Sequence, residues 1–340
     1  MITMRPTDFA EHLTQFLSVY LPTQKNASQN TVRSYRDTFK LLLQYCLKQY
    51  HIPAEKLSLN DLTHQLVMDF LVWVERERGC SVSTRNLRLA AIHSFFRYVQ
   101  YEEPAGLRDF QKILAIPVKK TPKPTIPFLT TDAMELLLSQ PDRSSPKGRR
   151  DLTLLALLYD SGTRVQELID LRVCDVILTN PAVLIVTGKG KKTRRVPLMN
   201  NTASLLDHYI RESHLTVAFK SHFALFMNKQ HQKLTRVGVT YIISKYVSLA
   251  RQVSPIVPER VTPHMFRHSK SMHLLQAGVN LIYIRDFLGH EDIQTTEIYA
   301  KCDTELKRKA IENAYPDLVN SHFPDWSQDD NLLSWLSSLR

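Results

Sequence analysis

The chain has 340 residues, 43% of them hydrophobic, and a formal net charge of +11. This length exceeds the usual size of one compact core and predicts two domains. Nine glycines and 17 prolines are too few for a low-complexity chain. No apolar run approaches the ~20 residues that span a bilayer, and the N-terminus lacks a signal-peptide core, so we expect a cytoplasmic protein.

The positive charge is concentrated in the body of the chain. Residues 317–340 carry four aspartates against one arginine, which leaves a charge of +14 on residues 1–316. Lysine and arginine side chains that meet a nucleic-acid backbone release condensed counterions, so nucleic acid is the natural partner. A basic surface kept for solubility is the alternative, because net charge bears on association and not on fold.

Residues 1–116 predict a helical domain. Apolar side chains recur at helical spacing in four stretches, at residues 9–20, 32–46, 62–74 and 89–99. Ser28 or Asn30 is expected to cap the second helix, and the fourth helix is expected to begin near Ser83 or Thr84.

The fourth helix should bury Leu89, Ile92, Phe96 and Val99. Basic residues outside the expected buried faces of the second and fourth helices are candidate DNA contacts, although a charged helix face is usually just solvated. These residues are Arg33, Arg36, Lys40, Arg85, Arg88 and Arg97.

Residues 117–128 predict an extended linker between the two domains. The segment 117–127 holds four prolines and three lysines without periodicity, and proline removes a backbone donor and disfavours helix at the residue before it. Its lysines could follow a phosphate backbone, though a merely soluble linker would look similar. They are Lys119, Lys120 and Lys123.

Residues 129–316 predict a second domain that is mainly helical with a small antiparallel sheet. Helices are expected at residues 131–139, 150–159 and 165–171, with Gly162 ending the second of them. Two β segments, 182–186 and 194–198, flank a glycine-containing turn and predict a hairpin with Lys189 at its tip. The turn does not match a nucleotide phosphate loop, because Lys191 is followed by Lys192 and the leading glycine is missing.

A second basic cluster follows Pro263. His264 and Arg267 lie three residues apart, so a helix would place them on one face, where both could grip the same phosphate. His264 and His268 have the spacing of a helical metal pair, but His-Glu-x-x-His is absent and the four cysteines form no C-x-x-C pair. We therefore expect neither a metal nor a cofactor.

Taken alone, Tyr299 would most often be a core residue, and its phenol is a poor nucleophile unless nearby cations favour the phenolate. Four segments of the sequence, taken in chain order, resemble the motifs of a known family. The chain resembles the tyrosine recombinases, or phage-type integrases, in Ser161-Gly-Thr-Arg-Val-Gln-Glu-Leu168, Thr187-Gly-Lys-Gly190, Thr262-Pro-His-Met-Phe-Arg-His268, and Leu288-Gly-His290 followed by Thr295-Thr-Glu-Ile-Tyr299. The N-terminal helices more loosely resemble the core-binding domain of that family.

The resemblance implies a role for each residue of the set. Arg164 and Arg267 would bind the non-bridging oxygens of a scissile phosphate, and His290 would donate to it. Tyr299 would attack, His264 would assist proton transfer from the nucleophile, and Lys189 would protonate the leaving 5′ oxygen. Glu167 would orient the first arginine. Two departures from the family pattern, at Thr163 and at Met272-His273, leave the local packing there open.

The resemblance further implies double-stranded DNA with inverted-repeat half-sites as the substrate, a tetramer on that DNA, and a place at the nucleoid. It leaves open whether an accessory DNA-bending or directionality protein is needed, and whether the enzyme serves as an integrase, a transposase or a chromosome-dimer resolvase. The rivals are a catalytically silent DNA-binding regulator on the same scaffold and a metal-dependent nuclease. Residues 317–340 are expected to form an acidic tail with a short amphipathic helix, docking on a neighbouring protomer or on its own domain.

Overall fold

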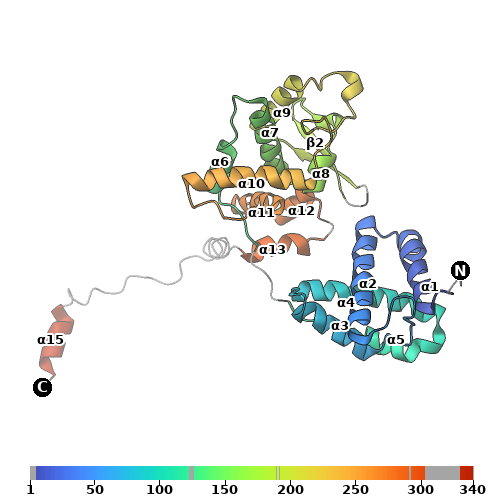
Figure 1. Ribbon diagram of the computed structural model, residues 1–340. Coiled ribbons are helices and arrows are strands. Elements are labelled where there is room, and N and C mark those ends of the chain that lie inside the picture. The colour runs from blue at the N-terminus through green and yellow to red at the C-terminus, as the bar shows by residue number, and fades with distance from the viewer. Residues whose placement is uncertain are drawn as a thin grey trace. The chain divides into compact units, whose positions relative to one another are not determined.

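The computed structural model describes residues 5–121, 126–188, 190, 192–290, 292–302 and 330–339. The chain divides into two compact units, Met1–Pro124 and Thr125–Arg340 (Figure 1). The predicted fold class is confirmed, because the described residues are mostly helical and contain one three-stranded antiparallel sheet. Among them, no helix has both the length and the apolar character needed to cross a membrane.

The N-terminal unit is a helical bundle. Its elements are α1 (Asp8–Gln15), a π-helical continuation η1 (Phe16–Gln24), α2 (Gln29–Tyr50), α3 (His64–Arg76), α4 (Val82–Glu102), a short 3-10 turn η2 (Pro104–Gly106) and α5 (Leu107–Leu114). The hydroxyls of Ser28, Thr63 and Ser81 cap α2, α3 and α4 by accepting a backbone N–H three residues further on. Helix α4 therefore begins slightly before the predicted start.

Arg85 is a correction to the sequence analysis, because its side chain is buried and not free on a solvated face. It is 3% exposed, and its Nη1 donates to the carbonyl of Pro117 at 3.1 Å. Residue 85 lies four positions before Leu89 on α4, so it continues the buried stripe that the sequence analysis began at Leu89. Arg88, also expected outside the stripe, is half-buried and donates to the Ser34 carbonyl and the Thr38 hydroxyl.

We expect Arg85→Ala to lower the free energy of unfolding of the N-terminal unit by about 1–3 kcal/mol, because the Pro117 carbonyl loses a buried donor. Hydrogen exchange of the α4 amides would report the loss. Arg97, which is exposed on the same helix, supplies the control variant Arg97→Ala. If Arg85→Ala instead reduced the slope of log DNA affinity against log salt by about one without faster exchange, Arg85 would be a phosphate contact after all.

The C-terminal unit holds the sheet and the remaining helices. Helices α6 (Thr131–Ser139), α7 (Pro146–Ser161) and α8 (Val165–Asp170) precede a 3-10 turn η3 (Val173–Asp175). The sheet follows in the order β1 (Val176–Ile177), β2 (Val183–Thr187), β3 (Thr193–Pro197), antiparallel throughout. Then come α9 (Asn200–Glu212), a 3-10 turn η5 (Ala218–Lys220), α10 (Arg236–Val253), α11 (Pro263–Gln276), α12 (Leu281–Leu288), α13 (Gln294–Cys302) and α15 (Asp330–Ser338).

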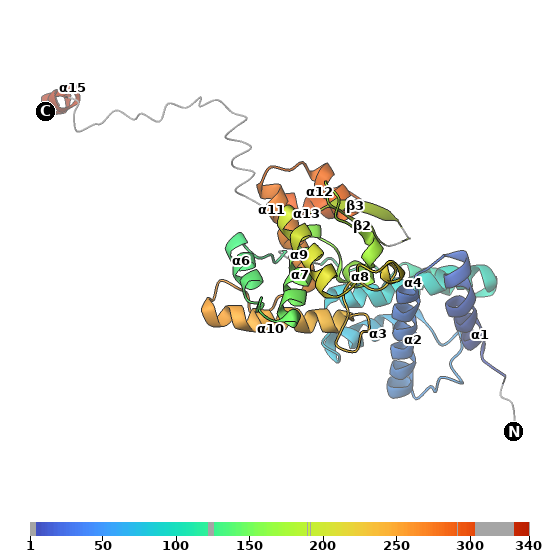
Figure 2. The ribbon, with the colours of Figure 1, turned by 90° about the horizontal axis from the view of Figure 1, so that it is seen from above.

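The predicted hairpin is confirmed, with Leu184 opposite Val196 in its register. The sequence analysis missed β1, because two residues are too few to show the alternation of a strand. Figure 2 shows β2 and β3 side by side, with α12 close to β3.

Helix α7 is the centre of the C-terminal core. Nearly all of its side chains from Asp151 onward are buried, and it packs against α9 and α11. Near its C-terminus, Asp160 accepts from Lys270 of α11 at 3.1 Å, and both side chains are largely buried. Helix α11 in turn contacts α10, α12 and α13 (Figure 1). These contacts fix the ends of α7, α11 and α12, where the residues of the candidate site lie.

Candidate active site

Arg164 stands at the sharp turn between α7 and α8. Gly162 ends α7 in the left-handed region, with φ of +56°, and a Cβ added there would lie 3.1 Å from side-chain atoms of Leu288 and Phe287. Glycine meets both demands, since it tolerates positive φ and close approach. The turn makes Arg164 the N-cap residue of α8.

Glu167 holds Arg164 in place. One carboxylate oxygen of Glu167 accepts the backbone N–H of Arg164 at 3.0 Å, and the other accepts Arg164 Nη1 at 2.7 Å. Burial by itself raises the pKa of Glu167, but hydrogen bonds and positive charge from Arg194 and Arg164 outweigh it and hold that pKa below its ordinary value. Glu167 is therefore an ionised carboxylate at neutral pH.

Arg267 is buried between two helix ends. It is 3% exposed, and it donates from Nη1 to the Gly162 carbonyl and from Nη2 to the Leu288 carbonyl, both at 2.7 Å. Burial, followed by repulsion from Arg164, lowers its pKa to about 9, so it remains charged at neutral pH. The carbonyls at helix C-termini carry partial negative charge, which suits a cation placed there.

Tyr299 on α13 is buried and hydrogen-bonded to His268. The side chain is 1% exposed, and its Oη lies 2.9 Å from His268 Nδ1. Burial raises the pKa of Tyr299, against the opposing influence of Ser271, Arg267 and Arg164. Burial, then His264 and Arg267, lowers the pKa of His268 to about 4. The pair is thus a neutral phenol with a neutral imidazole.

His264 and His290 complete the set. His264 is exposed on the first turn of α11, and its pKa is lowered by partial burial of the imidazole and by the charges of Arg267 and Arg164. His290 follows Gly289, which ends α12 with φ of +65°, and its Nδ1 lies 2.9 Å from Thr296 Oγ1. Burial, then the nearby arginines, lowers the pKa of His290 to about 4.

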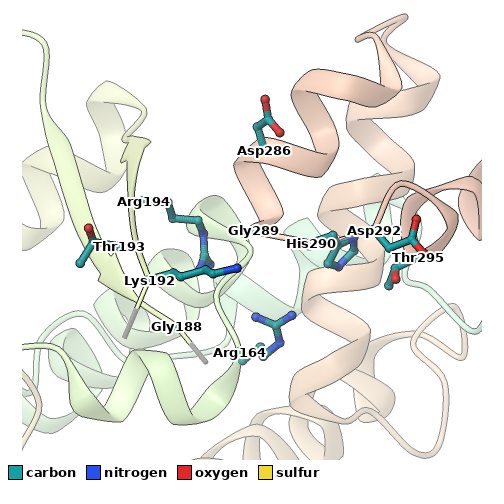
Figure 3. A pocket seen from close by; sticks show the side chains of 10 residues that line it. All are labelled: Arg164, Gly188, Lys192, Thr193, Arg194, Asp286, Gly289, His290, Asp292 and Thr295. Atoms are coloured by element: carbon teal, nitrogen blue, oxygen red, sulfur yellow. The ribbon is translucent and has the colours of Figure 1, made fainter. Parts of the chain in front are cut away.

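A cavity of about 530 Å³ opens beside these residues. Figure 3 shows the side chains of Arg164, Lys192 and His290 around its middle, each from a different element. Such a concentration of donors suits an anion. The lining consists of Arg164, Gly188, Lys192, Thr193, Arg194, Asp286, Gly289, His290, Asp292 and Thr295. Tyr299 is not among these residues, and its side chain is covered, at 1% exposure.

The structure brings Arg164, Glu167, Arg267, His290 and the His268–Tyr299 pair together around the ends of α7, α11 and α12. Lys189 lies outside the described residues. Sequence reasoning missed three further residues, which are Arg194 and Lys192 on the cavity wall and His268 at Tyr299. The only sequence signals were the basic run after the hairpin turn and the position of His268 directly after Arg267.

The departures at Thr163 and Met272-His273 are accommodated by local packing. Thr163 is fully buried, with its hydroxyl 3.0 Å from that of Ser161. Met272 is buried, and His273 Nδ1 lies 2.8 Å from the Tyr159 hydroxyl. Met272 packs in one cluster with Ile284, Leu288 and Tyr299.

Most of the predicted DNA contacts of the N-terminal unit lie on its surface. The exposed ones are Arg33, Arg36, Lys40, Arg97, Lys119 and Lys120. Two of these pair with neighbouring acids, Arg36 with Asp37 and Lys119 with Glu75. Lys123 lies outside the described residues.

Comparison with known proteins decides the family. Residues 127–305 match the model of the phage integrase family, and residues 13–103 match that of its N-terminal SAM-like domain. The chain belongs to the phage integrase family. It is a tyrosine-type site-specific recombinase, so the resemblance seen in the sequence is confirmed and the silent-regulator alternative is not favoured.

Two curated relatives cover nearly the whole chain. One, named as an integrase/recombinase, y4rC, of Sinorhizobium fredii, is 36% identical over 328 residues, which are 96% of this chain and 97% of that protein. The other, tyrosine recombinase XerC of Pelotomaculum thermopropionicum, is 31% identical over 310 residues, covering 90% and 98%.

Two solved structures share the fold. The XerH recombinase bound to a palindromic difH substrate superposes with a TM-score of 0.68 at 22% identity, over 85% of this chain and 81% of that one. The Tn1549 transposon integrase in complex with transposon right-end DNA gives a TM-score of 0.67 at 19% identity, over 88% and 98%.

The neutral histidines make stability depend on pH. The pKa of His268 is about 4 in the folded protein and ~6.5 in an unfolded chain, so the unfolded state binds more protons between these values. The contribution of neutral His268 to the free energy of unfolding is therefore fully present above pH ~6.5 and is lost as the pH falls toward 4.

We expect His268→Gln to reduce the slope of the free energy of unfolding against pH by the equivalent of at most one proton, measured by urea denaturation from pH 4.5 to 7. Tyr299→Phe keeps the imidazole and should keep the slope; equal slopes for His268→Gln and wild type would contradict the assignment.

Proposed function

We propose that the basic cavity binds the scissile phosphate of double-stranded DNA and that Tyr299 attacks its phosphorus. The observation that carries the proposal is the shared wall of the cavity, where Arg164, held by Glu167, faces His290 across a space of about 530 Å³. Donors preorganised around a developing negative charge are usually the largest single contribution to such catalysis. Arg267 is 3% exposed and uses one N–H of each Nη on a carbonyl, and we propose that its positive charge, placed behind Arg164, adds to the attraction for the phosphate.

The proposed reaction exchanges one phosphodiester for another. Tyr299 Oη forms a bond to phosphorus, the bond from phosphorus to the 5′ oxygen breaks, and Lys189 supplies the proton that the 5′ oxygen takes up. The products are a 3′-phosphotyrosine and a free 5′ hydroxyl. A 5′ hydroxyl from another strand reverses the step, so the bond is conserved and the steps need neither ATP nor a metal.

Tyr299 must lose its proton to attack, and His268 is a poor acceptor for it. The imidazolium of His268, with a pKa of about 4, is a far stronger acid than a phenol with an ordinary pKa of ~10. Transfer from Tyr299 to His268 is unfavourable in this structure, because burial raises the pKa of Tyr299 and lowers that of His268. The hydrogen bond therefore holds a neutral phenol. We propose that attack requires Tyr299 to leave His268 and reach the cavity, where His264 assists removal of its proton.

Tyr299→Phe should abolish covalent attachment to DNA while leaving DNA affinity nearly unchanged, because only the attacking oxygen is lost. The assay incubates each protein with nicked site DNA and resolves the products on a denaturing gel. Glu167→Gln is the comparison variant, expected to slow adduct formation without abolishing it, since Arg164 is retained. An adduct that persists in Tyr299→Phe would mean that another residue is the nucleophile.

We further propose that the substrate consists of inverted-repeat half-sites at which four protomers assemble. The palindromic substrate of the XerH structure supports the half-site arrangement. Both the transposon integrase and the XerC-type relatives are compatible with recombination at the nucleoid, serving either a mobile element or chromosome-dimer resolution. Activity of the purified chain on its own site would decide whether an accessory DNA-bending or directionality protein is needed.

The exposed apolar face of the C-terminal helix α15 is an argument for assembly of several protomers. Trp335 and Leu336 of α15 and Leu339 directly after it are 51–60% exposed, and a nine-residue helix is too short to be stable without burying such a face. We propose that it docks on a second copy of the chain.

Truncation after Pro316 should leave binding of one protomer to a half-site intact and remove cooperative binding to the full site, because the docking helix is lost. The same result is expected for Trp335→Ala with Leu336→Ala, and Ser338→Ala is the matched control. Gel-shift titrations of half and full sites measure both quantities. Unaltered cooperativity in the truncated protein would exclude docking on a second copy.

A further inference from the structure

Arg194 is a half-buried residue on the cavity wall, and the proposed reaction gives it no role. It lies on β3, directly after the turn that follows β2, and its side chain is 12% exposed. Its Nη2 donates to Glu167 Oε2 at 2.8 Å, and its Nε donates to the Phe287 carbonyl at 3.0 Å. One guanidinium therefore joins three segments that are far apart in the sequence.

The first segment is the start of α8, which carries Arg164. Glu167 divides its two oxygens, with Oε1 accepting from Arg164 Nη1 and Oε2 accepting from Arg194 and from the backbone N–H of Arg164. Arg164 thus directs a single guanidinium nitrogen at Glu167. If Arg194 were absent, Oε2 would be open to a second guanidinium bond from Arg164. That bidentate pairing would draw Arg164 away from the cavity.

The second segment is the turn between β2 and β3. A Cβ added to Gly188 would lie 3.3 Å from Glu167 Oε1 and 3.7 Å from Arg194 Nη1, so the backbone of the turn passes close to the ion pair. The same turn carries Lys192 on the cavity wall. Arg194 thereby ties the turn to the carboxylate that holds Arg164.

The third segment is the end of α12, from which His290 follows. Arg194 binds the Phe287 carbonyl, and a Cβ added to Gly289 would lie 2.9 Å from Arg194 Cδ. The guanidinium is therefore packed under the turn that leads to His290, itself on the cavity wall. Arg267 binds the neighbouring Leu288 carbonyl, so two arginines fix this helix end.

We propose that Arg194 is a positioning residue of the recombinase, which sets Arg164, the β2–β3 turn and His290 at their spacing around one phosphate. The inference rests on the proposed function, since it assumes that the cavity receives the scissile phosphate. Arg194 acts through Glu167 and the α12 carbonyl, to which its Nη2 and Nε donate. Misplacement of reacting groups by about 1 Å can cost on the order of 10²-fold in rate.

The neighbouring arginine supplies a matched control. Arg195 lies next to Arg194 on β3 but is exposed, because successive residues of a strand face opposite sides. Arg194→Lys keeps the charge, but a single ammonium cannot reproduce the fork that reaches both Glu167 Oε2 and the Phe287 carbonyl. Arg195→Lys makes the same chemical change on the other face.

The experiment measures the rate of adduct formation on nicked site DNA and, separately, the affinity for that DNA. Arg194→Lys should lower the rate about 10²-fold with affinity within about threefold of wild type, and Arg195→Lys should change neither. Combining Arg194→Lys with Glu167→Gln should cost little more than either change alone, because both act through one carboxylate. Arg194→Gln, which keeps one donor, provides a second variant if the lysine variant does not fold.

Equal rates for Arg194→Lys and Arg195→Lys would overturn the inference. So would additive losses in the double variant, or a loss confined to DNA affinity. Failure of the proposed function looks different, because wild type itself would then form no adduct or Tyr299→Phe would still form one.

Discussion

The carboxylate of Glu167 is the constraint on which the site depends. It is 6% exposed and lies between the guanidinium groups of Arg164 and Arg194. A buried carboxylate without partners would cost several kcal/mol, and so would a buried arginine, so each group requires the other. Because the arginines come from different elements, their shared acid fixes the start of α8 against β3.

Positive charge is concentrated at this site. Arg164 and Arg194 both lower the pKa of the buried Arg267, and the same arginines help to keep His290 neutral. Carbonyls at the ends of α7 and α12 supply the negative ends of dipoles that make this crowding tolerable. A phosphate in the cavity would balance this positive charge, so a site of this composition favours an anionic substrate.

Tyr299, the proposed nucleophile, lies apart from the cavity proposed to bind the phosphate. Tyr299 is buried against His268, whereas the cavity is lined by Arg164 and His290. In the proposed reaction, the phenol stays neutral and covered until Tyr299 leaves His268. A recombinase that cut DNA before its partners were in place would leave broken strands, and a covered nucleophile is a physical means of avoiding that outcome.

The sequence by itself determined the local features of this protein and the identity of its chemistry. Helical periodicity predicted α1 to α4 and α6 to α8, and the ordered segments around Arg164, Arg267, His290 and Tyr299 predicted the family. Only the tertiary structure decided which side chains meet. The bonds from Arg267 to Gly162 and from Arg194 to Phe287 span 105 and 93 residues, and no local pattern encodes contacts at such separations. The burial of Arg85 and the pairing of His268 with Tyr299 belong to the same class, because each depends on what packs against a helix face and not on the composition of the helix.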